Sequence, residues 1–389
     1  MSQLLESRWS ETKEALLEGL QGNKRSVMAT TLANTRKYLS ESATAGATSA
    51  GNVATLNRVI LPVIRRVMPT VIANELVGVQ PLTGPVGQIH TLRVRYSDTF
   101  SGSTGGSTTA GDEALSPFKI AEGYSGASPG KPASTAALEG VAGNRLSIQI
   151  LKQTVEAKTR KLSARWTFEA AQDAQAQQGI DIEAEIMAAL AQEITAEIDQ
   201  EVLRSLSTLS ATVLTYDQAA VSGTATFVGD EHAALAVQIN RAANLIAQRT
   251  RRGAGNWAVV SPTTLTLLQS ATTSAFARTT EGTFEAPTNT KFVGTLNSAM
   301  KVYVNTYAEN DDVLVGYKGG SESDAAAFYC PYIPLMSSGV VLDPSTFEPV
   351  VSFMTRYGYV ELTNTASSLG NAADYLGKVA VTSANLRFA

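Results

Sequence analysis

The stretch Asp181-Ile-Glu-Ala-Glu-Ile-Met-Ala-Ala-Leu-Ala-Gln-Glu-Ile-Thr-Ala-Glu-Ile198 has the most regular pattern in the chain. Its large apolar residues recur every four positions, which places them on one side of an α-helix. Asp181 is a suitable N-cap, and Glu183 and Glu185 follow where the helix dipole favours negative charge. The pattern predicts a helix over 181–206, roughly 40 Å long, that serves as a structural strut.

The rest of the chain mixes helical and strand patterns without the regular βαβ alternation of a doubly wound or barrel enzyme, so the expected fold class is α+β. Helices are expected over 4–39, 56–68 and 233–251. Strands are expected at 92–96, 146–150, 257–260, 301–307, 313–317, 326–330 and 350–362. A polar turn, 308–312, would join two of these strands.

Two stretches are rich in small residues. Residues 42–51 contain only Ser, Ala, Thr and Gly, which is typical of a linker, so the first 50 residues are interpreted as an arm and a poor candidate for core. Residues 97–144 contain nine of the 30 glycines and no clear periodicity. A structureless segment of this length is uncommon inside a domain, so either it is disordered or another molecule supplies the surface that it needs. We expect it to have no core of its own.

The composition excludes several functional classes. Charged residues make up 17% of the 389 residues and the net charge is -4, which excludes a strongly basic nucleic-acid binder. A single cysteine and two histidines leave little for a disulfide framework, a zinc site or histidine catalysis. The chain has no apolar run of about 18 residues and its start does not resemble a signal peptide, so a reducing, soluble compartment and no membrane contact are expected.

Two glycine motifs resemble catalytic or cofactor-binding sequences. Gly126-Ala-Ser-Pro-Gly130 matches a hydrolase elbow, but Pro129 lacks the N–H that an oxyanion hole needs after Ser128. Gly253-Ala-Gly255-Asn-Trp-Ala258 follows a predicted helix and precedes a strand, the reverse of a dinucleotide site. We interpret it as a glycine C-cap. Gly130-Lys131-Pro132 is not a P-loop, since proline replaces the residue that would reach magnesium.

The remaining candidate groups also favour structural interpretations. Glu193, Glu197 and Glu201 share a helical face, but a two-metal site would need nearby histidines, so a solvated or partner-facing surface is expected. His90 and His232 have no partner that the sequence identifies. Cys330 is expected to be a small buried hydrophobe. We therefore expect no cofactor, no metal and no catalytic residue.

Several ordered motifs resemble one protein family. They are Ile64-Arg-Arg-Val-Met-Pro-Thr-Val-Ile-Ala73, Gly78-Val-Gln-Pro-Leu-Thr-Gly-Pro-Val-Gly87, Glu156-Ala-Lys-Thr-Arg-Lys-Leu162, Ala171-Gln-Asp-Ala174, Arg252-Gly-Ala-Gly-Asn256, Val315-Gly-Tyr-Lys-Gly319, Tyr329-Cys-Pro-Tyr332 and Phe353-Met-Thr-Arg-Tyr-Gly358. Over about residues 56–360 the chain resembles the major capsid proteins of T-even-like tailed bacteriophages. The resemblance implies the Hong Kong 97-like capsid fold and a shell of hexamers and pentamers around packaged double-stranded DNA.

The resemblance also implies a division of the chain. The parts are an N-terminal arm (1–60, with a removable segment 1–41), a first part of the peripheral domain (61–96), an extended loop over a neighbouring subunit (97–144), the peripheral domain with its spine helix (145–207), an axial domain (208–350) and a C-terminal return to the peripheral domain (351–389). T-even-like relatives carry an inserted domain in the extended loop. The loop here is shorter and has no second apolar periodic segment, so a plain or reduced loop is expected.

The resemblance further implies partners and processing. Expected partners are further copies of the chain, a scaffold, a prohead protease, a portal, vertex or decoration proteins, and DNA bound non-specifically, with assembly in the bacterial cytoplasm and a final location in the virion. The protease of such phages cuts after a Leu/Ile-x-Glu tripeptide. Leu39-Ser-Glu41 precedes the small-residue stretch, which favours the bond between Glu41 and Ser42, although Leu4-Leu-Glu6 and Leu16-Leu-Glu18 also fit.

Candidate intersubunit contacts are arginines: Arg65, Arg66, Arg93, Arg95, Arg249, Arg251 and Arg252. Each of them is equally compatible with an exposed position or an ion pair within the chain. Two alternatives to a major shell protein remain open. One is the paralogous vertex protein of the fivefold positions, and the other, from a different class, is a soluble hydrolase that uses Ser128.

Overall fold

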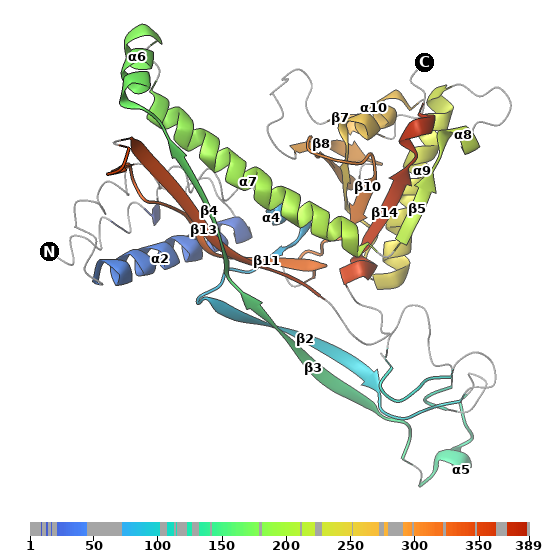
Figure 1. Cartoon of the computed structure of the whole chain (residues 1–389). Helices are drawn as coiled ribbons and strands as arrows, with labels where there is room; N and C mark the ends of the chain where they lie inside the picture. Colours follow the sequence, from blue (N-terminus) through green and yellow to red (C-terminus); the bar gives the residue numbers. More distant parts are fainter. Residues whose placement is uncertain are drawn as a thin grey trace. The chain divides into compact units, whose positions relative to one another are not determined.

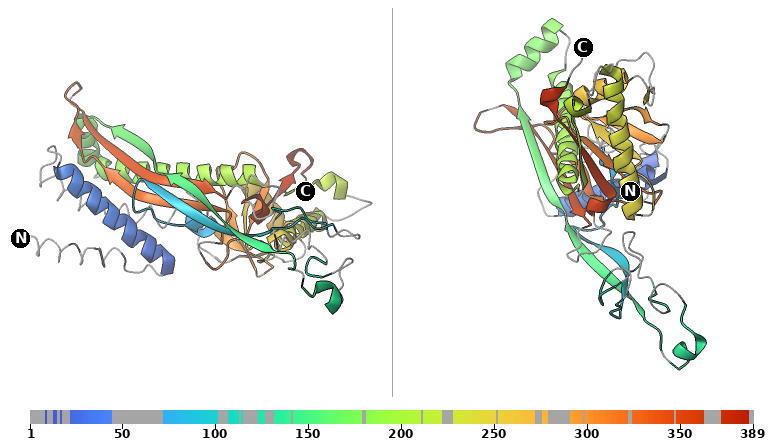
Figure 2. Two further views of the ribbon diagram at one scale, coloured as in Figure 1. Left: turned by 90° about the horizontal axis from the view of Figure 1, so that it is seen from below. Right: turned by 90° about the vertical axis from the view of Figure 1, so that its right-hand side faces the viewer.

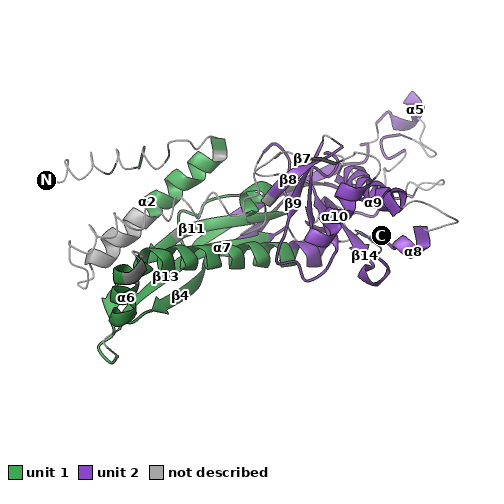
Figure 3. Cartoon of the chain, turned by 90° about the horizontal axis from the view of Figure 1, so that it is seen from above, with its two compact units in different colours: residues 1–87, 155–205, 327–360 green, residues 88–154, 206–326, 361–389 purple. Residues whose placement is uncertain are grey.

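A long helix and two mixed β-sheets organise the chain in the computed structural model (Figure 1). The structure describes residues 9, 13–14, 17, 22–44, 72–101, 107–112, 114, 123–126, 132–140, 142–178, 181–210, 212–221, 228–250, 252–271, 276–278, 291–297, 299–321, 324–346, 348–362 and 372–386. The chain divides into unit 1 (1–87, 155–205 and 327–360) and unit 2 (88–154, 206–326 and 361–389), shown in Figure 3. The α+β class expected from the sequence is confirmed.

Unit 1 is a sheet with a helix on each side. Its elements are α2 (Gly22–Thr44), α4 (Ala73–Leu76), β1 (Gly78–Val79), β4 (Lys158–Arg165), α6 (Phe168–Gln178), most of α7 (Ile182–Leu209), β11 (Ala327–Ser337), β12 (Val341–Leu342) and β13 (Pro349–Glu361). The strand order is β1-β11-β13-β12, and β4 pairs antiparallel with β13. Figure 2 shows α2 on one side of these strands and α7 on the other.

Helix α7 confirms the prediction that the sequence made most clearly. It spans Ile182–Leu209 over 28 residues. Asp181 caps it, because its Oδ1 accepts a hydrogen bond from the N–H of Glu183 at 3.1 Å. The apolar face is buried, with Ile194, Ile198 and Leu206 each at most 2% exposed. The helix is therefore held by packing along its apolar face from Leu190 to Leu206, whereas Ile182 and Ile186 are only partly buried.

Unit 2 contains a seven-stranded mixed sheet and a two-stranded hairpin. The sheet elements are β5 (Thr212–Tyr216), β6 (Trp257–Val260), β7 (Phe276–Arg278), β8 (Lys291–Leu296), β9 (Met300–Val304), β10 (Val313–Gly316) and β14 (Leu376–Val381), in the order β5-β14-β10-β6-β9-β8-β7. The helical elements are α5 (Thr135–Leu138), α8 (Gln218–Val221), α9 (Val228–Thr250), α10 (Pro262–Ser270), η1 (Ala372–Tyr375) and η2 (Ser383–Asn385). The hairpin consists of β2 (Val86–Tyr96) and β3 (Leu146–Glu156).

The core of unit 2 lies between the sheet and helices α9 and α10. Leu235, Ile239 and Ile246 of α9 pack in one cluster with Val302 and Val315 from the sheet, and all five are at most 1% exposed. The apolar positions of α9 are spaced by three and four, which directs them to this one side. The predicted helix over 233–251 and the predicted buried strand at 257–260 are thus confirmed as α9 and β6.

The strands on either side of the polar turn 308–312 are β9 and β10. They are not neighbours in the sheet, because β6 lies between them and pairs with both. The division expected at residue 350 differs from the observed one. Strands β11 and β13 belong to the sheet of unit 1, whereas β14 pairs with β5 and β10 in unit 2. Which unit a strand belongs to depends on the strands with which it pairs, and the sequence does not identify those strands.

The helix expected over 56–68 lies outside the described residues. Helix α2 continues to Thr44, three residues into the stretch 42–51 that was interpreted as a linker. Among the described residues, no helix is both long enough and apolar enough to cross a membrane.

Candidate assembly surfaces

The β2–β3 hairpin presents an exposed apolar stripe. Leu146, Ile148 and Ile150 of β3 are 56%, 67% and 65% exposed. Alternate residues of a strand point to the same face, so these side chains form one row. A two-stranded hairpin has no second layer to cover such a row and is marginally stable alone. Branched aliphatic side chains that are exposed in a contiguous row are typical of a protein interaction surface.

The end of this hairpin is built around aromatic rings. Tyr96, Ala114 and Tyr124 form a small buried cluster, and Phe100 packs against it. The rings of Tyr96 and Tyr124 meet edge to face with centroids 4.6 Å apart. The expectation that 97–144 has no core of its own is therefore wrong. The four residues of this cluster are widely spaced in the sequence and follow no helix or strand period. The sequence alone therefore does not predict that they pack together.

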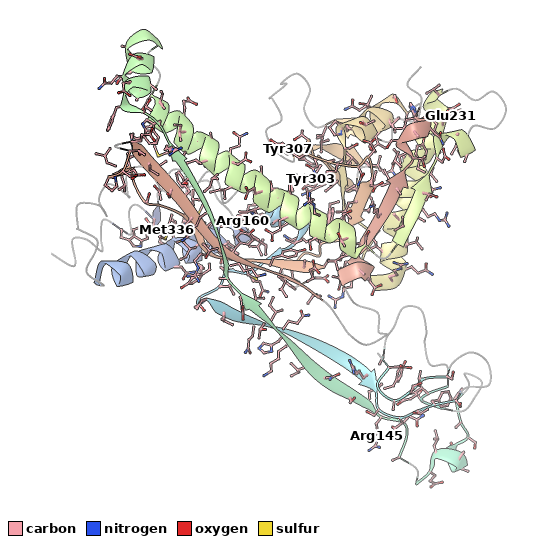
Figure 4. The ribbon with its side chains drawn as sticks, viewed as in Figure 1. Arg145, Arg160, Glu231, Tyr303, Tyr307 and Met336 are labelled. Carbon is pink, nitrogen blue, oxygen red and sulfur yellow. The ribbon has the colours of Figure 1, made fainter. Side chains whose placement is uncertain are left out.

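Hydrogen bonds fix the same region to the start of β3. The Tyr124 hydroxyl donates to the carbonyl oxygen of Arg145 at 2.7 Å, and the Asn144 amide donates to the carbonyl of Tyr124 at 2.8 Å. The backbone N–H of Arg145 donates to Asp98 at 2.7 Å, and its guanidinium lies 3.4 Å from the same carboxylate. These two interactions, the backbone hydrogen bond first, lower the pKa of Asp98. We name residues 94–145 the hairpin tip; Figure 4 labels Arg145 there.

Helix α2 contributes to the core of unit 1. Val27, Met28 and Leu32 are at most 3% exposed, and α2 packs against β11. The Asn34 amide donates to the carbonyls of Leu82 at 2.7 Å and Tyr332 at 3.2 Å, just where the pairing between residues 80–82 and β11 ends. The interpretation of the first 50 residues as a poor candidate for core is therefore wrong for this helix. Its buried residues repeat at three and four positions, but Thr31 among them is polar, which weakens the pattern.

A guanidinium that the sequence did not single out joins α7 to the sheet of unit 1. Arg160 of β4 lies 2.8 Å from Glu197 and 2.5 Å from Glu201, and donates from Nε to the Tyr357 hydroxyl at 2.6 Å. Tyr357 also donates to Glu201. Partial burial disfavours the charge on Arg160, but its bonds to Glu201 and Tyr357 outweigh this and raise its pKa. Glu197 and Glu201 are thus paired within the chain, but their side chains remain 44% and 43% exposed, so the acidic face is solvated as expected. Figure 4 labels Arg160 on β4.

The structure places only part of the predicted arginine set. Arg65, Arg66 and Arg251 lie outside the described residues, and the side chain of Arg93 in β2 is not described. Arg249 lies in the last turn of α9. Arg95 is half-buried, and its Nε has no hydrogen-bond partner in the structure. Arg252 pairs with Asp324 of the same chain at 2.6 Å, so it is already engaged within unit 2.

The glycine motif at 253–255 is explained by close packing. A Cβ at Gly253 would lie 2.5 Å from the Tyr317 ring, and one at Gly255 would lie 2.8 Å from Val315. Gly253 is not among the described residues with positive φ, so the expected left-handed glycine cap is wrong. The order of helix, glycines and strand is as predicted, because α9 ends at Thr250 and β6 begins at Trp257.

The other candidate groups form no catalytic arrangement that the structure describes. Ser128 lies outside the described residues, and His90 is exposed on β2. His232 does have a partner that the sequence did not identify, because its Nδ1 lies 2.6 Å from the Ser270 hydroxyl, but the ring is 2% exposed. Cys330 is buried as expected, and burial raises its pKa to about 12. Among the described residues, no three His, Cys, Asp or Glu side chains gather in a group that could hold a metal.

Comparison with known proteins identifies the family. The family described as major capsid protein Gp23 matches residues 53–381. The chain is 30% identical to the major capsid protein of Vibrio phage KVP40 over 413 residues, which cover 83% of this chain and 80% of the relative. It is also 30% identical to the major capsid protein of Enterobacteria phage T4 over 417 residues, covering 82% of this chain and 78% of the relative.

Solved structures similar to this chain include those of Microbacterium phage Oxtober96 and the capsid of Myoviridae phage XM1. Their TM-scores are 0.46 and 0.44 at 10% and 9% identity, and the matches cover 79% of this chain and 90% and 91% of the two structures. From the family match and the relatives, the chain belongs to the Gp23 family and is a major capsid protein of a tailed phage, a structural protein of the virion shell and not an enzyme.

Proposed function

We propose that this capsid protein forms hexamers, and pentamers at the fivefold positions, of an icosahedral head around double-stranded DNA. The observation that carries the proposal is the exposed stripe of Leu146, Ile148 and Ile150 on a hairpin that has no covering layer of its own. Burial of such a row against another copy would contribute roughly 25 cal/mol per Å² of apolar surface removed from water. The net charge of -4 suits a wall that does not bind the genome tightly.

The elements fit the Hong Kong 97-like arrangement that the family resemblance implies. In this assignment α7 is the spine helix of a peripheral domain formed by unit 1, and the seven-stranded sheet of unit 2 is the axial domain. The β2–β3 hairpin is the extended loop, and the hairpin tip replaces the inserted domain of T-even-like relatives. A scaffold, a prohead protease, a portal and decoration proteins are the further partners proposed, with assembly in the host cytoplasm.

The test compares two neighbouring substitutions on β3. Ile148→Asp places a charge in the apolar row, whereas Gln149→Asp, the matched control, places the same charge on the opposite face of the strand. Negative-stain microscopy of the expressed protein with its scaffold should show rings, tubes or shells for the wild type and the control, but not for Ile148→Asp. A wild-type chain that stays a dispersed monomer at high concentration contradicts the assembly proposal, and assembly of Ile148→Asp contradicts the role of the stripe.

Processing after Glu41 remains part of the proposal. Glu41 lies in the last turn of α2, where helix ends fray most readily, so the bond to Ser42 can be reached without unfolding the buried part of the helix. Cleavage there would separate the α2 residues packed on β11 from the rest of the chain. Intact-mass measurement of mature particles should find a chain that begins at Ser42. A chain that still begins at Met1 or Ser2 contradicts this site.

A further inference from the structure

Helix α7 contains a buried carboxylate of which only one oxygen accepts a hydrogen bond. Asp199 is 1% exposed, and its Oδ1 accepts a hydrogen bond from the backbone N–H of Ile72 at 2.8 Å. Its Oδ2 is buried and has no hydrogen-bond partner in the structure. Buried polar atoms are satisfied in the great majority of cases, so this exception requires an explanation.

The ionisable groups that the structure describes around Asp199 do not neutralise it. From β11, Tyr329 and Cys330 are both buried, and burial raises the pKa of each, so both are uncharged near neutral pH. Arg160 of β4 is engaged with Glu197 and Glu201, and Tyr357 of β13 with Glu201. On the side of α4, Glu75 pairs with Lys24 of α2. Lys24 and Arg160 are thus bound to other carboxylates.

An uncharged carboxyl suits this environment better than an ionised one. An ionised carboxylate that is buried with one N–H donor and no cation carries a large desolvation penalty, whereas the neutral acid leaves one hydroxyl unsatisfied. Burial raises the pKa of Asp199 to about 7, and the hydrogen bond from Ile72 opposes the rise only in part. When the group ionises, hydration of the carboxylate requires that Ile72 and α4 separate from α7.

We propose that Asp199 is a proton-operated latch between α7 and Ile72, closed while the carboxyl is neutral and loosened when it ionises. Ile72 is the N-cap residue of α4, so the latch controls how the start of α4 is attached to α7. The latch goes beyond the role in shell formation and involves residues of unit 1 alone.

The direction of the pH effect follows from linkage. The pKa of Asp199 is higher in the closed latch than the ordinary aspartate pKa. Protonation therefore stabilises the closed latch fully at pH values below the ordinary aspartate pKa, and this stabilisation is lost as the pH rises through about 7. Between those two values the opening equilibrium should increase by about tenfold per pH unit, since one proton is released on opening.

Hydrogen exchange measured by mass spectrometry on the full chain tests this. Protection factors, corrected for the intrinsic exchange rate, should fall by about tenfold per pH unit between pH 5 and 7 for Ile72–Leu76 and for 195–203. Asp199→Asn should abolish this dependence. Asp181→Asn, which removes an exposed carboxylate from the same helix, should keep it. Protection that is independent of pH in the wild type, or still pH-dependent in Asp199→Asn, would overturn the latch.

An infrared titration keeps the proposal testable if Asp199→Asn does not fold. The wild type should show the C=O stretching band of a protonated carboxylic acid at pH 5 and lose it near neutral pH. The band should persist in Glu231→Gln and Asp374→Asn, which remove the other buried carboxyls that the structure describes. The absence of such a band in the wild type at pH 5 would overturn the latch. Shell formation, followed separately by microscopy, is unaffected by either result.

Discussion

Helix α2 and the hairpin tip obtain their order in opposite ways. The helix contributes Val27, Met28 and Leu32 to a core that it shares with β11, whereas the tip closes a small cluster of its own around Tyr96 and Tyr124. A shared core couples a segment to the cooperative unfolding of the unit, while a private cluster can open by itself. The same substitution chemistry should therefore have global consequences in one region and local consequences in the other.

The largest effect is expected for Leu32→Ala. Leu32 is 1% exposed, and truncation removes buried methyl groups and leaves a cavity, at a cost of about 2–5 kcal/mol in the free energy of unfolding. Urea denaturation of the purified chain followed by tryptophan fluorescence measures it. Arg25→Ala, on the exposed side of α2, is the control and should stay within about 0.5 kcal/mol of the wild type. If Leu32→Ala only quickened hydrogen exchange of the α2 amides and left the free energy of unfolding unchanged, the helix would not share the core of unit 1.

A smaller effect is expected for Asn34→Ala. The substitution removes the donor from two carbonyls, those of Leu82 and Tyr332, at a half-buried position where water can replace it in part. The expected loss is about 1 kcal/mol in the free energy of unfolding. Asn34→Asp keeps the size of the side chain but has no amide donor, so it should lose at least as much. Full stability of the aspartate variant would contradict the role of these hydrogen bonds.

The two regions also show what the sequence can and cannot predict. Helix α7 was predicted to within three residues because its apolar repeat and the Asp181 cap are local signals. The resemblance indicated the family from motifs spread over both units. The core role of α2 could not be predicted, since it depends on β11, which lies about 300 positions further along the chain. For the same reason Arg160 was missed, because its carboxylate partners lie on α7 and its hydroxyl partner on β13.

The smallest global effect is expected for Tyr124→Phe. The substitution keeps the ring in its edge-to-face contact with Tyr96 but removes the hydroxyl that donates to the Arg145 carbonyl at 2.7 Å. One such hydrogen bond contributes about 1 kcal/mol, and that loss should affect only the opening of the hairpin tip. Since 1.4 kcal/mol corresponds to a factor of ten, hydrogen exchange should quicken about fivefold for amides of residues 94–100 and 142–146. The urea midpoint of the chain should not change. A shifted midpoint would show that the tip unfolds together with the rest of unit 2, and the contrast with α2 would then be one of degree.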